Sequence, residues 1–445
     1  MGRRPIPVRA LAPHRASAFG GTLLSTLIPA LAAVTSSVTL ARTLGPFARG
    51  EMAAILLWPL VLGILGDPGV SFALSFLVSR DRESATGLWT IGLLVAFVWG
   101  GVLAVAGGAI LTAALPMSGS ALPALRLALA SVPLTLVLSF GCHLLLGCGR
   151  LGASNLVRGS GLVLYAAGVV ALAASGQGSL LTYAAAWVAA QGAASLLAAV
   201  LVLREVGGVL RWRPDLWSPV FSYGARVYAS AIAAQASLRL DQLMMSVLGL
   251  TAQLGVYVVA VSVASATGPF FSALAIVALH RATASSSGLD AARDIRGVLR
   301  ACLFLGVPMI AAASLLAWPL VPAVFGRPYA HAVLPAQILL VATFFQGANA
   351  ILGNTLRGLG LPGRPAAAEG LGSLLTVGLL VWLLPRFGAL GAAAASLVAY
   401  GLVAFVQFRF VQKATGLAAR EILRRDASLR ELLRSIFAGL RRGEG

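Results

Sequence analysis

The apolar segment 219–248 holds the densest set of polar and ionisable side chains in the chain. On a helix that advances 100° per residue they form two opposite stripes, one with Arg226, Ser230, Ser237 and Asp241 and the other with Tyr228, Gln235, Arg239, Gln242 and Ser246. Guanidinium groups bind phosphates through paired hydrogen bonds, and amides and hydroxyls bind sugars. A helix with two polar sides must be surrounded by protein or water instead of lipid.

Arg239 is the leading candidate for an anion-binding group in a central cavity, because it lies near the middle of this segment. An ionisable side chain inside a membrane helix costs about 2.5–3.5 kcal/mol on insertion scales, so each one is a candidate functional residue. The alternative for Arg239 is a structural ion pair, for example with Asp67. Arg226 either contributes to the cavity or extends its charge to the membrane surface. Four uncharged residues are expected to line the same cavity: Tyr228, Gln235, Gln242 and Ser246.

Two acidic residues, Asp67 and Asp241, are candidates for coupling to a proton or another ion. Asp67 lies in the Gly-Asp-Pro-Gly sequence at 66–69, where proline and glycine should interrupt a helix. Its carboxylate either takes up an ion or caps the following helix, and Asp241 is either a counter-ion of an arginine or a proton site. Arg42 and Arg126, at the outer ends of their segments, line the cavity or bind lipid headgroups.

The elements that must position these residues are membrane helices. The chain has 445 residues, 59% hydrophobic and 11% charged, whereas soluble domains average roughly 25% charged residues. Segments of about 20 apolar residues, long enough to cross a bilayer, occur at 17–41, 51–79, 87–115, 121–148, 155–174, 179–203, 219–248, 253–280, 298–322, 332–356, 366–385 and 389–411.

The net charge of +19 reflects the orientation of the chain in the membrane and not nucleic-acid binding. Most Lys and Arg residues fall in alternate connections, which the positive-inside rule places in the cytoplasm together with both termini. We therefore predict a cytoplasmic N-terminal segment at 1–16, an N-lobe at 17–203, a cytoplasmic linker at 204–218, a C-lobe at 219–411 and a cytoplasmic tail at 412–445. The basic amphipathic tail suits the surface of anionic lipids, the alternative being a solvated tail.

An internal repeat supports this division. Five glycines recur 211 residues later, so that Gly147, Gly149, Gly152, Gly159 and Gly161 correspond to Gly358, Gly360, Gly363, Gly370 and Gly372. A weaker echo relates Gly45 and Gly50 to Gly249 and Gly255. The predicted fold is an all-α polytopic membrane protein with about 12 transmembrane helices in two six-helix lobes, related as parallel repeats around a central cavity.

Catalytic, cofactor and metal motifs are missing from this sequence. Both glycine clusters spell GxGxxG, but an apolar membrane helix precedes each, whereas a dinucleotide site needs a strand there. No Walker motif is present, and the three cysteines lack metal-ligand spacing. We therefore expect no enzyme activity, no cofactor and no metal.

Short motifs resemble those of the bacterial polysaccharide transporters, the oligosaccharide (O-antigen-type) flippases. The sequence from Ala41 to Pro46 is similar to their N-terminal signature. The sequence Arg239-Leu-Asp241, followed by Leu248-Gly249 and Gly255-Val-Tyr257, resembles the start of their second lobe, and a glycine-arginine turn ends at Arg150. The resemblance implies a twelve-helix, two-lobed exporter fold.

This resemblance implies a transporter that moves a polyprenyl-pyrophosphate-linked oligosaccharide from the inner to the outer leaflet of the bacterial plasma membrane by alternating access. Its expected partners are the lipid-linked oligosaccharide, anionic lipids at the tail and polysaccharide assembly proteins. The alternatives are a multidrug or cation antiporter of the same superfamily and a membrane polymerase or glycosyltransferase. The enzyme alternatives would need catalytic groups and commonly a large outer loop.

Overall fold

The structure of the protein, a computed structural model, describes residues 15–208, 210–237, 239–284, 288–416 and 420. For 15–26, 229–237, 284 and 288–294 it describes the backbone alone. These parts of the chain are helical and contain no strand. The predicted amphipathic tail lies almost entirely outside the described residues.

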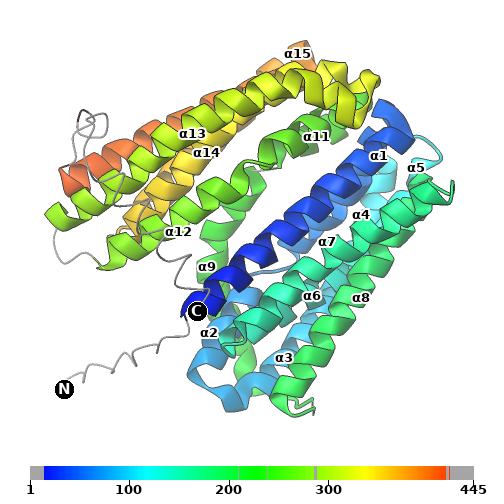
Figure 1. Ribbon diagram of the computed structural model, residues 1–445. Coiled ribbons are helices and arrows are strands. Elements are labelled where there is room, and N and C mark those ends of the chain that lie inside the picture. The colour runs from blue at the N-terminus through cyan, green and yellow to red at the C-terminus, as the bar shows by residue number, and fades with distance from the viewer. Residues whose placement is uncertain (1–14, 209, 238, 285–287, 417–419, 421–445) are drawn as a thin grey trace.

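Two bundles of helices make up the molecule, and they converge at the upper right of Figure 1 and diverge toward the lower left. The N-lobe consists of α1 (Arg15–Leu65), α2 (Val70–Arg80), η1 (Arg82–Ser84), α3 (Ala85–Leu94), η2 (Val95–Trp99), α4 (Gly100–Ala114), α5 (Ala121–Leu129), α6 (Ser131–Gly147), α7 (Leu151–Ala174) and α8 (Leu180–Val206). The C-lobe follows η3 (Pro214–Leu216) and consists of α9 (Trp217–Ser237), α10 (Leu240–Val247), α11 (Thr251–Ser265), α12 (Gly268–Ala284), α13 (Gly288–Phe325), η4 (Arg327–Ala332), α14 (Val333–Gly358) and α15 (Gly363–Thr415). The buried apolar residues form three clusters: one lies in the N-lobe, one joins N-lobe helices to Val220 of α9, and one joins C-lobe helices to Ala41 and Ala54 of α1.

The chain is a multi-pass membrane protein. By length and composition, eight described helices can cross a bilayer, or nine if α11 and α12 form one bent span. Two of the long helices combine predicted segments: α1 has 51 residues and is kinked at Gly45 (φ 72°), and α15 has 53 residues and is kinked at Gly388 (φ 54°). Each of them folds back at its kink: Arg49 donates to the Ser37 hydroxyl at 3.4 Å, and a Cβ on Gly372 would lie 2.2 Å from the Val403 side chain. A straight helix would hold these two pairs about 18 and 46 Å apart. The count of twelve stays a prediction.

The predicted interruption at residues 66–69 is confirmed. Helix α1 ends at Leu65 and α2 begins at Val70, and between them Gly69 has a φ of 83°. The segment 219–248, by contrast, is not the single helix that we expected. It breaks after α9, and Arg239 is the N-cap of α10 with φ −130°. The break suits Asp241, because a carboxylate in the first turn of a helix is favoured by the helix dipole. The two stripes therefore do not continue across residue 238.

Repeat-related glycines share unusual backbone conformations. Gly45 and Gly249 have φ values of 72° and 69°, and Gly149 and Gly360 have φ values of 77° and 78°. Two repeat-related glycines also meet where α1 crosses α11. A Cβ atom on Gly50 would lie 1.8 Å from the Thr251 carbonyl oxygen, and one on Gly255 would lie 1.9 Å from that of Pro46. The two lobes are thus joined at a point that admits no side chain on either helix.

Candidate functional site

Two cavities flank α1, and Leu60 and Ile64 contribute to the walls of both. The C-lobe cavity has a volume of about 370 Å³ and is lined by Leu60, Ile64, Arg239, Asp241, Gln242, Tyr257, Val261, Ala264, Ser265, Leu339, Ala342, Thr343, Gln346, Ser396 and Tyr400. The N-lobe cavity has a volume of about 390 Å³ and is lined by Leu60, Gly63, Ile64, Asp67, Ser71, Phe72, Thr135, Leu136, Ser139, His143, Trp187, Gln191 and Tyr228.

The break between α9 and α10 supplies the charged groups of the C-lobe cavity. Arg239 is half-buried at the break, whereas Asp241 and Gln242 are buried in the first turn of α10. The Asp241 carboxylate accepts a 2.7 Å hydrogen bond from the Gln242 backbone N–H and a second from the Tyr257 hydroxyl. The cavity therefore holds a guanidinium and a hydrogen-bonded carboxylate two residues apart in the chain.

Most of the other polar groups of the C-lobe cavity were not predicted from the sequence. Ser265 and Tyr257 come from α11, Thr343 from α14, and Ser396 and Tyr400 from α15. Each has only apolar residues or glycine on either side of it in the chain, and the packing of three helices brings the five together. Tyr257 was visible in a motif, but nothing in the sequence pointed to its hydrogen bond with α10.

The N-lobe cavity collects hydrogen-bonding groups around the break in α1. Asp67 caps α2, because its Oδ1 accepts a 3.1 Å hydrogen bond from the Ser71 backbone N–H. Tyr228 reaches across from α9 and donates its hydroxyl to the Ile64 carbonyl at 3.0 Å. The same carbonyl accepts a longer, 3.3 Å hydrogen bond from the Asp67 backbone N–H, since residue 68 is proline and has no N–H to continue the helical pattern. The Nδ1 atom of His143 lies 2.9 Å from the Ser139 carbonyl oxygen.

The four uncharged residues predicted to share one cavity are separated in the structure. Gln242 lines the C-lobe cavity and Tyr228 the N-lobe cavity. Ser246 lines neither cavity and accepts a 3.2 Å hydrogen bond from the indole N–H of Trp58. The side chain of Gln235 lies outside the described part of the chain.

Three of the four predicted arginines lie away from both cavities. Arg226 is exposed and donates to the Ser222 carbonyl at 2.9 Å. Arg126 is exposed beside a separate groove between α4 and α5. Arg42 is exposed and joins the two lobes, because it donates to the carbonyls of Ala323 and Val324 at 2.7 Å each.

Arg239 is the predicted arginine that lines a cavity, and it does so without Asp67. Both residues are described, but they line different cavities and form no ion pair with each other. A structural Arg239–Asp67 pair is therefore not what holds these charges in place. Asp67 has its own local partner in the Ser71 N–H.

Comparison with known families gives a clear assignment. A family model described as polysaccharide biosynthesis protein matches residues 39–334, which is more than half of the chain. The chain belongs to this polysaccharide biosynthesis protein family. This agrees with the resemblance seen in the short motifs around Arg42 and Arg239. A comparison with curated protein sequences gives no match.

Solved structures share the fold of this family member. The inward closed structure of the lipid II flippase MurJ has a TM-score of 0.72 and 13% identity, covering 93% of this chain and 91% of that chain. An inward-facing multidrug resistance MATE family transporter has a TM-score of 0.68 and 13% identity, covering 90% and 100%. An outward-facing MATE structure has a TM-score of 0.58 and 15% identity, covering 90% and 95%. These likenesses confirm the predicted all-α, two-lobed membrane fold.

Proposed function

We propose that this protein flips a polyprenyl-(pyro)phosphate-linked oligosaccharide from the inner to the outer leaflet by alternating access, for the synthesis of a surface polysaccharide. Its membrane is the bacterial plasma membrane, with both termini in the cytoplasm. Further partners are anionic lipids at the basic tail and polysaccharide assembly proteins. Membership of the polysaccharide biosynthesis family and a fold shared with a lipid flippase support this function.

The observation that carries the proposal is the position of Arg239. It brings a guanidinium to the wall of a cavity between α1 and the C-lobe helices, in a chain with only 11% charged residues. A guanidinium presents a planar set of donors that matches phosphate oxygens. Beside it, Gln242, Gln346 and Ser396 offer the amide and hydroxyl groups that sugar hydroxyls need.

A conformational cycle is supported by the way the lobes touch. Arg42 of α1 holds the last turn of α13, and the hydroxyl of Tyr329 donates to the Ala41 carbonyl at 3.2 Å. The hydroxyl oxygens of Ser37 and Ser262 lie 2.8 Å apart, within hydrogen-bond distance, across the same junction. These few polar contacts lie at the end of the lobes that the charge distribution predicts to be outer, and outward opening would break them.

A multidrug or cation antiporter is the second candidate, and one observation favours it. Asp241 places a buried carboxylate beside Tyr257 and Tyr400, and carboxylates and aromatic rings are the groups that bind organic cations. In the flippase, the same carboxylate would couple transport to an ion gradient. A flippase would thus depend mainly on Arg239 for binding its substrate, whereas a cation antiporter would depend mainly on Asp241.

Mass spectrometry of lipids that copurify with the protein separates the two functions. We expect a polyprenyl-linked glycan with the wild-type protein and its loss with Arg239→Ala. The matched control is Arg386→Ala, because Arg386 is exposed, contacts the Trp382 ring and lines neither cavity. Absence of any polyprenyl lipid, together with ethidium efflux that Asp241→Asn abolishes, would contradict the flippase and favour the antiporter.

A further inference from the structure

The function proposed above assigns no ligand to the N-lobe cavity, although this cavity is as large as the one in the C-lobe. Its volume of about 390 Å³ falls within the range of about 300–1,000 Å³ that is usual for small-molecule sites. Helices α1, α2, α6 and α8 of the N-lobe and α9 of the C-lobe contribute to its walls. The polar groups that these walls leave without partners indicate what the cavity binds.

Gln191 of α8 brings an unpaired amide to the wall of this cavity. The residue is only 6% exposed, lines the cavity, and forms no hydrogen bond with any described residue. Burying an amide without a hydrogen bond is unfavourable, and buried polar groups normally have a partner. A ligand in the cavity is therefore the expected partner of this amide.

The internal repeat shows that packing alone does not require a glutamine at this place. The amide oxygen of Gln191 lies against Gly161 of α7, where a Cβ would be 2.5 Å from it. At the repeat-related Gly372, the corresponding contact is made by Val403, whose methyl group would lie 2.2 Å from such a Cβ. A valine is thus enough to fill the space opposite the glycine in the C-lobe. In the N-lobe the same space holds an amide that lines a cavity, which indicates a role in binding.

Trp187 precedes Gln191 by one helical turn, so the two side chains lie on the same face of α8. Its indole N–H donates to the Ser131 hydroxyl at 3.1 Å, and the ring of Tyr165 packs perpendicular to it with centroids 5.2 Å apart. These contacts hold the indole in place and satisfy its polar atom, while the side chain still lines the cavity. The face of an aromatic ring carries partial negative charge, which suits the C–H groups of a sugar ring.

Two other polar groups of the cavity offer acceptors. Tyr228 donates its proton to the Ile64 carbonyl at 3.0 Å, which leaves its own oxygen as an acceptor. The Nδ1 atom of His143 faces the Ser139 carbonyl oxygen at 2.9 Å, so in the neutral ring Nδ1 carries the hydrogen and Nε2 accepts. A sugar matches this set, because its many hydroxyls donate to such acceptors and also bind an amide.

The charge of the cavity disfavours the phosphate end of the substrate. Asp67 contributes a carboxylate, and the described lining residues include no arginine or lysine to offset it. Phosphate oxygens would be repelled here, whereas Arg239 attracts them in the C-lobe cavity. Leu60 and Ile64 border both cavities, so a glycan that starts at Arg239 can continue past these two side chains into the N-lobe.

We infer that the N-lobe cavity binds a sugar of the glycan, beyond the sugars that lie beside Arg239. Trp187 packs against one face of the sugar ring, and the Gln191 amide forms hydrogen bonds with its hydroxyls. This inference rests on the proposed flippase function. It assigns recognition of the outer part of the glycan to the N-lobe and recognition of the phosphate to the C-lobe.

Binding of two lipids to the full-length protein in nanodiscs tests the inference. One is the lipid-linked glycan that copurifies with the wild-type protein, and the other is polyprenyl pyrophosphate, which has no sugar. We expect Gln191→Val and Trp187→Ala each to weaken binding of the glycan lipid about tenfold and to leave binding of polyprenyl pyrophosphate unchanged. The unchanged binding also shows that both variants are folded. Arg239→Ala should weaken binding of both lipids.

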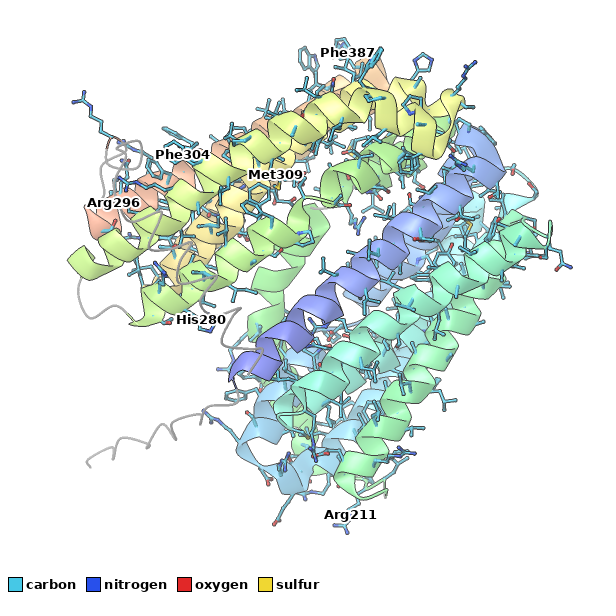
Figure 2. All side chains as sticks on the ribbon, viewed as in Figure 1. Arg211, His280, Arg296, Phe304, Met309 and Phe387 are labelled. Atoms are coloured by element: carbon cyan, nitrogen blue, oxygen red, sulfur yellow. The ribbon has the colours of Figure 1, made fainter. Side chains whose placement is uncertain are left out.

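Phe387→Ala is the control for the aromatic substitution, because Phe387 is 57% exposed on α15, at the top of the C-lobe in Figure 2, and lines neither cavity. It should bind both lipids like the wild type. Equal weakening of both lipids by Gln191→Val, or wild-type binding of the glycan lipid by both N-lobe variants, would overturn the sugar subsite. Loss of ethidium binding in these variants, with glycan binding intact, would make the cavity a cation site instead.

The two lipids also separate this inference from the function on which it rests. If only the subsite is wrong, the glycan lipid still binds to the wild-type protein and its binding still depends on Arg239. If the wild-type protein yields no lipid-linked glycan and binds no polyprenyl pyrophosphate, the flippase function fails as well.

Discussion

The two cavities beside α1 have nearly the same volume and share a wall, yet their chemistry differs. The C-lobe cavity contains Arg239 and Asp241, whereas the N-lobe cavity contains Asp67 and His143, with no arginine or lysine among its described lining residues. Glycines related by the predicted repeat share backbone conformations at positions outside both cavities. The predicted duplication thus appears in shared glycine conformations, while the side chains that line the two cavities differ between the lobes.

This difference predicts that the two cavities bind different parts of the substrate. The anionic part of a substrate belongs with Arg239, because phosphate oxygens are stabilised by a guanidinium. The N-lobe cavity offers Gln191, Ser139 and Tyr228, which suit uncharged sugar hydroxyls.

Gly255→Val should have the largest effect, because it disturbs the crossing that places both cavities against α1. A Cβ on Gly255 would meet the Pro46 carbonyl oxygen at 1.9 Å, so the helices must separate. We expect a loss of about 3 kcal/mol and a melting temperature about 3 °C lower, measured by thermal unfolding in detergent. Gly378→Val is the control, since a Cβ on that glycine meets nothing within 4 Å. Equal stability of both variants would show that the crossing is not tight.

Arg239→Ala should reduce export of surface polysaccharide about 100-fold, because two charge-assisted hydrogen bonds to phosphate contribute about 3 kcal/mol. Arg239→Lys should recover only part of this, since lysine cannot form the paired contact. The measurement is surface glycan per cell, normalised to the amount of protein in the membrane. Arg386→Ala should export normally. If Arg239→Ala exports the polysaccharide at the wild-type level, the anion-binding site is not at Arg239 in the C-lobe.

The sequence predicted the architecture better than the site, for a physical reason. Hydropathy and charge determine which segments enter a membrane, so two lobes of apolar helices could be predicted from composition and repeats. The interruption at residues 66–69 was also local, because proline and glycine alone cause it. Both outcomes depend on neighbouring residues in the chain.

The grouping of side chains in the cavities depended on contacts between distant segments. The helical projection failed at Arg239, where α10 starts anew, so residues predicted on one stripe separated into different surroundings. Tyr228 lines the N-lobe cavity although it belongs to α9. Tyr400 lines the C-lobe cavity although it lies 161 residues after Arg239. No local pattern carries that information.

Asp241→Asn should have an intermediate effect and separates the two acidic residues. Asp241 is buried and accepts from the Gln242 backbone N–H and from the Tyr257 hydroxyl. The amide oxygen of asparagine can still accept from the Gln242 N–H while its NH2 donates to the Tyr257 hydroxyl oxygen, so the substitution removes the charge and keeps both contacts. We expect about tenfold lower export, equivalent to about 1.4 kcal/mol, and loss of its dependence on the proton or sodium gradient. The assay is transport in vesicles with an imposed gradient.

Asp67→Asn is the matched variant in the other cavity. Asparagine also caps helices, so α2 should remain stable, and export should fall by no more than about twofold, or about 0.4 kcal/mol. Asp67→Ala should cost about 1 kcal/mol of stability through the lost cap. A larger transport loss in Asp67→Asn than in Asp241→Asn would reverse the assignment and place coupling in the N-lobe.

Arg126→Ala should have the smallest effect and tests whether cavity position, and not charge alone, decides function. Arg126 is exposed beside a groove between α4 and α5, outside both cavities. Exposed charges at such sites contribute little, about 0–1 kcal/mol, so export should stay within about twofold of wild type. The measurement is again surface glycan per amount of protein. A loss as large as that of Arg239→Ala would mean that an outer arginine also contacts the substrate, and the N-lobe would then share the anion.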